Sequence, residues 1–101
     1  YKRFTMQRTN SDAVNRRFFI AIDALVTYKK VTSLSGFCIL HGLSPSRYRE
    51  MRLQFGLTPK KDYIARYRNM EIEALSILVA NYPISALWLL TGRGNMLTKK
   101  L

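Results

Sequence analysis

The hydrophobic positions along the chain recur at the spacing of an α-helix. Val14, Phe18, Ile22 and Leu25 follow one another at intervals of three or four residues, which predicts an amphipathic helix over residues 12–30. The later apolar stretches are short and are separated by glycine and proline. The pattern predicts an all-α fold, a compact bundle of about five short helices.

Residues 34–53 fit two short helices joined by a tight turn. Thr32 or Ser33 can cap the first helix, and Gly42 suits the turn because glycine adopts the left-handed backbone conformation that ends a helix. Ser44 is a good N-cap for the second helix, and Pro45 suits its first position. We interpret this stretch as a helix-turn-helix. Its inward faces are expected to carry Phe37, Cys38, His41, Leu43, Tyr48 and Met51.

The second helix of this unit, Ser44 to Phe55, is expected to present polar and charged side chains on its outward face. Arginine can bind two acceptors of guanine and glutamate can accept from cytosine, so such a face suits the major groove of DNA. The residues expected to contact base edges are Ser46, Arg47 and Glu50, with Gln54 on the same face. Phosphate contacts are expected from Ser33, Ser44, Arg49, Arg52, Lys60, Lys61, Arg66 and Arg68.

After Phe55 the pattern becomes irregular for about a dozen residues. Thr58 and Pro59 offer another helix start, and the stretch is strongly basic. We interpret its apolar residues, Tyr63, Ile64 and Tyr67, as anchors that tie a basic loop to the core. Stacking of the two tyrosines on the bases of a single strand is the alternative.

Two further helices are expected near the C-terminus. Asn69 can cap a strong helix that runs to about Tyr82, where Pro83 breaks it. Ser85 begins a last short helix, which Gly92 stops. The chain is short enough for one domain, over residues 11–97. Residues 1–10 are expected to form a basic, flexible arm, and residues 98–101 a tail.

The net charge of +11 is the main clue in the composition, since 17 basic residues face six acidic ones. Residues 1–68 carry +10 of this charge and residues 69–101 only +1, so the basic surface belongs to the part that contains the helix-turn-helix. Such a charge favours a polyanionic partner, either nucleic acid or an anionic membrane surface. No membrane span is expected, because Asp23 interrupts the longest apolar candidate.

The chemistry-bearing residues do not suggest an enzyme. The single cysteine, Cys38, excludes an internal disulfide and suits a reducing cytosol, and with one histidine, His41, it cannot form the usual zinc site. The carboxylates offer no convincing acid–base pair, and the serines lie in helix caps rather than in a nucleophile motif. We therefore expect no catalytic residue, no metal, no cofactor and a cytoplasmic location.

Two motifs in this chain resemble the lambda-repressor-like helix-turn-helix domains of phage repressors and bacterial regulators. GLSPSRYREMR resembles the turn and recognition helix, and YPISALWLLTGRGNML resembles the closing helices. The resemblance covers about Asp12 to Leu97, although Leu34 and Cys38 stand where the family often has Gln and Ala. It implies a nucleoid-associated regulator from a bacterium or phage, repressor-like, that binds double-stranded DNA in a sequence-specific way, often as a dimer.

Two alternatives to duplex binding remain open from the sequence, and a homodimer is considered as part of duplex binding itself. A basic module for RNA or single strands would use the two loop tyrosines for stacking. A protein-interaction domain would keep the fold without binding DNA. A homodimer would use apolar residues near the C-terminus, chosen from Ile84, Leu87, Trp88, Leu89, Leu90, Met96 and Leu97, although Trp88 and its neighbours also suit a core.

Overall fold

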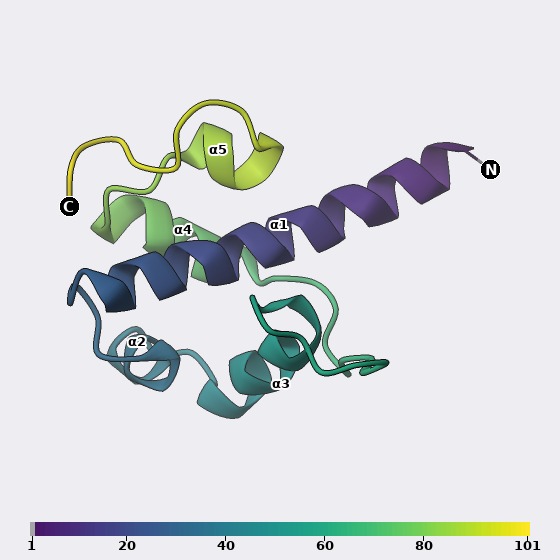
Figure 1. The fold of residues 1–101 in the computed structure, drawn as a ribbon, viewed down its shortest axis with the longest axis horizontal. Coiled ribbons are helices and arrows are strands. Elements are labelled where there is room, and N and C mark those ends of the chain that lie inside the picture. Colours follow the sequence, from purple (N-terminus) through teal and green to yellow (C-terminus); the bar gives the residue numbers. More distant parts are fainter. Residues whose placement is uncertain (1) are drawn as a thin grey trace.

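One long helix, α1 (Lys2–Thr27), runs through the middle of the molecule and separates two pairs of shorter helices (Figure 1). The structure is a computed structural model that describes the backbone of residues 2–101 and the side chains of residues 10–101. The other helices are α2 (Leu34–Leu40), α3 (Pro45–Phe55), α4 (Ile72–Asn81) and α5 (Ala86–Thr91). Among the described residues there are five helices and no strand, so the all-α prediction is confirmed.

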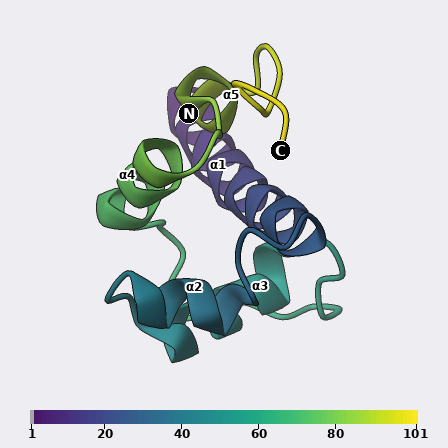
Figure 2. The same cartoon turned by 90° about the vertical axis from the view of Figure 1, so that its left-hand side faces the viewer.

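The two pairs of helices lie on different sides of α1. Figure 2 shows α2 and α3 together below α1, whereas α4 lies to its left and α5 lies near its N-terminal end. Four of the five helices are short, as predicted. The exception is α1, which has 26 residues and begins ten residues before the expected start at Asp12. The predicted flexible arm includes Tyr1 and the side chains of residues 2–9, which lie outside the described part of the chain, so its contacts stay a prediction.

The core is built around the second half of α1. Phe18, Phe19, Ile22 and Leu25 are all fully buried, which makes the apolar stripe of this helix unusually broad. The breadth follows from the packing, since α1 contacts α2, α3 and α5 at once. Facing residues complete the core, among them Leu34, Phe37, Cys38, Tyr48, Met51, Phe55, Ala74, Leu78, Ile84 and Leu89.

The connection between α3 and α4, residues 56–71, is called the basic loop here. It contains no helix, so the helix start expected at Thr58 and Pro59 does not form. The prediction that Asn69 caps the next helix is wrong as well, because α4 begins at Ile72 with Glu71 in the N-cap position. Tertiary hydrogen bonds explain the late start, as the carbonyl of Arg68 accepts from Asn15 on α1 at 2.8 Å.

The C-terminal segment begins and ends its helix as predicted. The Ser85 hydroxyl accepts a hydrogen bond from the Trp88 amide at 3.2 Å, and Gly92 ends α5 in the left-handed conformation with φ of +78°. The chain then returns along the start of α5, where the Thr98 amide donates to the Pro83 carbonyl at 2.9 Å. Residues 98–101, expected as a tail, are thereby fastened to the domain.

Candidate nucleic-acid interface

The helix-turn-helix forms with the local geometry that its sequence predicts. Gly42 has a φ of +73° in the turn between α2 and α3. The Ser33 hydroxyl caps α2 by accepting from the Gly36 amide at 2.9 Å, and the Ser44 hydroxyl caps α3 by accepting from the Arg47 amide at 3.3 Å. Both serines expected at phosphates are therefore already part of a helix cap.

Three parallel rows of side chains divide the surface of α3. The row Tyr48, Met51 and Phe55 is buried against the core. The row Ser46, Arg49 and Leu53 is exposed to solvent, and Arg52 beside it is exposed too. The third row, Arg47, Glu50 and Gln54, is only half-exposed, although the sequence predicted these residues on the outward face.

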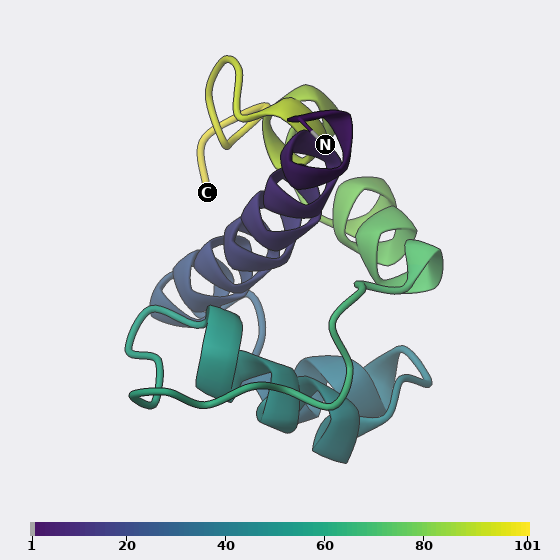
Figure 3. The same cartoon turned by 90° about the vertical axis from the view of Figure 1, so that its right-hand side faces the viewer.

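The basic loop covers this third row. It runs along α3 in the opposite direction to the helix, so that its residues 65–69 lie beside α3 residues 54–47 (Figure 3). At one end the Ala65 amide donates to Gln54 Oε1 at 2.8 Å, and at the other Arg47 Nη2 donates to the Asn69 carbonyl at 3.1 Å. The loop is thus attached along most of the helix.

Glu50 makes the central attachment. Its carboxylate accepts from the Tyr63 hydroxyl at 2.8 Å, from the Arg66 amide at 2.6 Å and from the Tyr67 amide at 3.4 Å. These bonds stabilise the charged form, above all the bond from the Arg66 backbone, and they hold the pKa of Glu50 below its ordinary value of 4.5. A carboxylate that accepts three loop donors has little acceptor capacity left for a cytosine.

Arg47 is engaged in the same way. Its guanidinium carbon lies 4.5 Å from the centre of the Tyr67 ring, close enough for a cation–π contact. A second nitrogen lies 3.9 Å from a carboxylate oxygen of Glu71. The two residues that the sequence assigned most directly to base edges, Arg47 and Glu50, therefore both bind the loop in this structure.

The anchors of the loop are partly those that were expected. Tyr63 packs against the core and bonds to Glu50, as an anchor should. The prediction that Ile64 is an anchor is wrong, since 65% of this residue is exposed. Its small neighbour Ala65 is buried instead, with 3% exposed. Tyr67 lies at the surface, 39% exposed, with Arg47 against its ring. The sequence missed Ala65 because an irregular segment has no period that marks its buried positions.

The expected phosphate-contacting cations lie on two neighbouring elements. Arg49 is exposed on α3, and one of its guanidinium nitrogens donates to the Ser35 hydroxyl of α2 at 3.0 Å. The cations of the basic loop are all exposed, as is Arg52 on α3. They are Lys60, Lys61, Arg66 and Arg68.

A polar hollow separates the start of α3 from the basic loop. Its volume is about 260 Å³. Both serines near the helix start, both arginines and the Glu50 carboxylate line it, so its walls offer hydrogen bonds and charge beside the two tyrosines. The lining residues are Ser44, Ser46, Arg47, Glu50, Tyr63, Arg66 and Tyr67.

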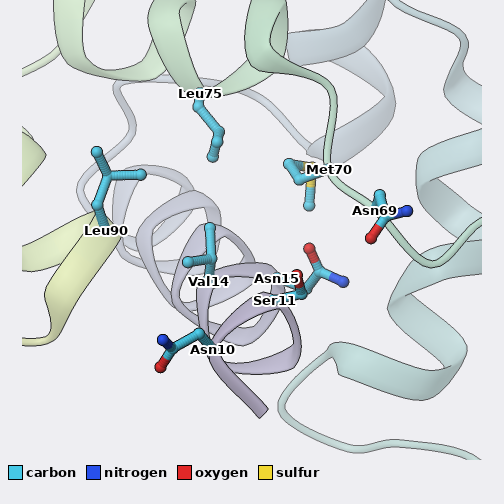
Figure 4. A pocket seen from close by; sticks show the side chains of 8 residues that line it. All are labelled: Asn10, Ser11, Val14, Asn15, Asn69, Met70, Leu75 and Leu90. Atoms are coloured by element: carbon cyan, nitrogen blue, oxygen red, sulfur yellow. The ribbon is translucent and has the colours of Figure 1, made fainter. Parts of the chain in front are cut away.

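A different hollow lies where the first half of α1 meets α4 and α5. Figure 4 shows Val14, Leu75 and Leu90 gathered around it from these three helices, with Asn15 and Met70 at its side. A second hollow between α4 and α5 adjoins it, since Leu75 and Leu90 line both. We call this combined surface the apolar groove. Its lining residues are Asn10, Ser11, Val14, Asn15, Asn69, Met70, Ile72, Leu75, Ser76, Val79, Ala86, Leu89 and Leu90.

Two of the residues considered for a homodimer contact are buried instead. Ile84 is 2% exposed and Leu89 is 1% exposed, so both belong to the core of one chain. Leu87 and Leu90 remain as exposed apolar residues of α5, at 56% and 52%. Ile72 at the start of α4 is more exposed still, at 77%. The available apolar surface is thus shared by α4 and α5.

Metal-binding and membrane-spanning features are absent from the described part of the chain. No three side chains of the His, Cys, Asp and Glu types come together there as metal ligands would. None of its helices combines the length and the apolar character that crossing a membrane requires. Cys38 is fully buried, and burial raises the pKa of its thiol to about 11. His41 bonds to the Tyr82 hydroxyl at 2.8 Å, as a histidine at the core boundary would.

Comparison with known proteins finds no relative of this chain. No protein family matches the chain, and neither a curated protein nor a solved structure matches it.

Proposed function

We propose that this chain binds double-stranded DNA in a sequence-dependent way, with α3 in the major groove, and acts as a transcriptional regulator of the lambda-repressor-like type. The observation that carries the proposal is the exposed row Ser46, Arg49 and Leu53 on a helix whose other two rows are held by the core and the loop. A helix that is held on two sides and exposes its third row to solvent is what readout in a major groove needs.

Charge supports the same partner. The net charge of +11 is concentrated in residues 1–68, which include the helix-turn-helix and the basic loop. Cations on the loop neutralise phosphates beside the groove that α3 enters, which gives affinity without sequence preference. Because such attraction extends to any polyanion, selection among DNA sequences is the property that must be measured.

The test is selection of duplexes from a random pool at near-physiological salt. The wild-type chain is expected to enrich a defined motif. Arg49, which the sequence assigned to phosphates, is proposed here to contact a base. Arg49→Ala should therefore blur that motif at one base pair, because a good bidentate contact contributes about 1–3 kcal/mol of discrimination. Arg93→Ala is the matched control, since Arg93 is exposed and follows α5, a helix that Figure 1 shows on the other side of α1 from α3. Absence of any enriched duplex motif would refute the proposal.

The structure gives less support to single-strand binding. Stacking on bases needs an exposed aromatic face. Tyr63 is half-buried and its hydroxyl is bonded to Glu50, while the Tyr67 ring already lies against Arg47. If single strands nevertheless compete better than duplex in the same assay, RNA or single-strand binding becomes the better account.

We also propose that two copies pair through the apolar groove and present their α3 helices to a two-fold symmetric site. Among residues 10–101, whose side chains the structure describes, no charged side chain lines this groove, so these parts of two copies meet there with little repulsion. Leu90→Glu should convert a dimer to a monomer in sedimentation equilibrium. Leu57→Glu, at an exposed leucine of the basic loop, should leave the association unchanged. A wild-type chain that is monomeric at high concentration would contradict the pairing.

A further inference from the structure

Glu50 has two possible roles that the structure helps to separate. It lies at the sixth position of α3, where an exposed carboxylate could reach a base in the major groove. Its oxygens instead meet the Tyr63 hydroxyl and the Arg66 and Tyr67 amides, all of them from the basic loop. A group whose acceptors are already used inside the molecule would have to give up those bonds to read a base.

The bonds from Glu50 also decide where the loop cations lie. Arg66 donates its own backbone amide to the carboxylate, and Arg68 follows two residues later at the surface. Gln54 binds one end of this segment and Arg47 binds the other, so residues 65–69 lie alongside α3 instead of extending into solvent. Cations held in register with a helix lose less conformational freedom when that helix meets DNA.

We propose that Glu50 is a positioning residue that clamps the basic loop to α3, and that base reading falls to the exposed row of Ser46 and Arg49. The inference rests on the proposed function for its second half, the reading of bases. Its first half, the clamp, concerns the protein alone. In this arrangement the loop forms a second ridge beside α3, and Arg66 and Arg68 on that ridge neutralise phosphates.

The clamp predicts that neutralising Glu50 weakens DNA binding, whereas the change in net charge alone predicts stronger binding. Glu50→Gln removes a negative charge, and Coulomb attraction alone would strengthen binding to DNA. If Glu50 clamps the loop, the variant frees Arg66 and Arg68 and binds every duplex more weakly. The slope of log affinity against log salt should become shallower by about one to two, because each lost phosphate contact contributes roughly 0.9. The selected motif should not change.

Matched variants isolate the two halves of the inference. Glu73→Gln removes the same charge from an exposed position on α4 and should bind DNA as well as the wild type or slightly better. Arg49→Ala should reduce discrimination at one base pair by roughly 5- to 150-fold. Circular dichroism of each variant verifies that the helices remain.

The clamp itself is measured without DNA, from the amide signals of Arg66 and Tyr67 in ¹⁵N–¹H spectra. In Glu50→Gln these two signals should move strongly and exchange faster with solvent, while the amides of the core helices keep their positions. In Glu73→Gln both loop signals should stay in place. Loop amides that are unchanged in Glu50→Gln would overturn the clamp.

Binding results separate the remaining outcomes. Weaker binding to all duplexes with an unchanged motif supports the proposal. Tighter binding, or a motif that changes at one position in Glu50→Gln, would overturn it and make Glu50 a base reader. A wild-type chain that selects no duplex motif refutes the proposed function and the reading assignment with it, whereas the amide signals still decide whether Glu50 holds the loop.

Discussion

Replacing Tyr48 with phenylalanine is expected to weaken the fold at the junction between α3 and α4. The Tyr48 side chain is fully buried, and its hydroxyl donates to Glu71 Oε1 at 2.5 Å, just before α4 begins. The substitution removes only the hydroxyl. The ring keeps its packing, including its contact with Phe18 at a centroid distance of 5.8 Å.

The size of the effect follows from the exposure of the acceptor. A hydrogen bond to a charged group contributes about 1.5–3 kcal/mol to stability. The lower end applies here because the Glu71 side chain is 37% exposed, and water can replace the lost donor. We expect a loss of about 1.5 kcal/mol, which lowers the melting temperature by about 6–12 °C in a domain of this size. Tyr48→Ala, which also leaves a cavity, should cost about 3–5 kcal/mol.

Urea unfolding followed by circular dichroism measures the free energy of unfolding for Tyr48→Phe, Glu71→Gln and the double variant. If the two side chains interact, the double variant should lose less stability than the sum of the single losses. Additive losses, or a Tyr48→Phe variant as stable as the wild type, would refute the reasoning. The slope of the free energy of unfolding against urea concentration should stay the same in all variants, because unfolding exposes the same surface area.

Three further outcomes are expected. Ser44→Ala should lower the free energy of unfolding by about 1 kcal/mol in a denaturant titration, because α3 loses its N-cap, and an unchanged midpoint would contradict this. Thermal unfolding should show Gly92→Ala to be more destabilising than Gly42→Ala. Both positions have positive φ, so alanine at either one costs about 1–2 kcal/mol of backbone strain. The new methyl group at Gly92 would in addition lie 3.1 Å from the guanidinium of Arg17, whereas Gly42 has open space around it. Finally, the pKa of Glu50 is lowered, so its contribution to stability is present above pH 4.5 and is lost as the pH falls through its lower folded-state pKa. The Arg66 amide signal should therefore titrate with a midpoint below 4.5, and a midpoint at or above 4.5 would contradict the clamp.

The sequence by itself determined the features that depend on neighbouring residues. The turn at Gly42, the caps at Ser33 and Ser44, and the stop at Gly92 all form as predicted, because a φ angle or a cap involves only the next three or four residues. The buried row of α3 and the core stripe of α1 were also predictable. Their spacing repeats with the helix, and one side of each must leave water.

Only the tertiary structure decided what the remaining polar row of α3 does. The sequence placed Arg47, Glu50 and Gln54 on the outward face of the helix, and it assigned Arg47 and Glu50 to base edges. Their partners come from a loop 11 to 22 residues further along, and no local pattern specifies which amides of an irregular segment will meet them.

The same reason explains the late start of α4. Asn69 is the better cap by type, yet its carbonyl accepts from Arg47, and the neighbouring Arg68 carbonyl accepts from Asn15. These long-range bonds keep the segment out of the helix until Glu71, the N-cap residue of α4. Local propensity therefore predicted which helices form, whereas hydrogen bonds between distant residues decided where one of them begins and which face of another stays free.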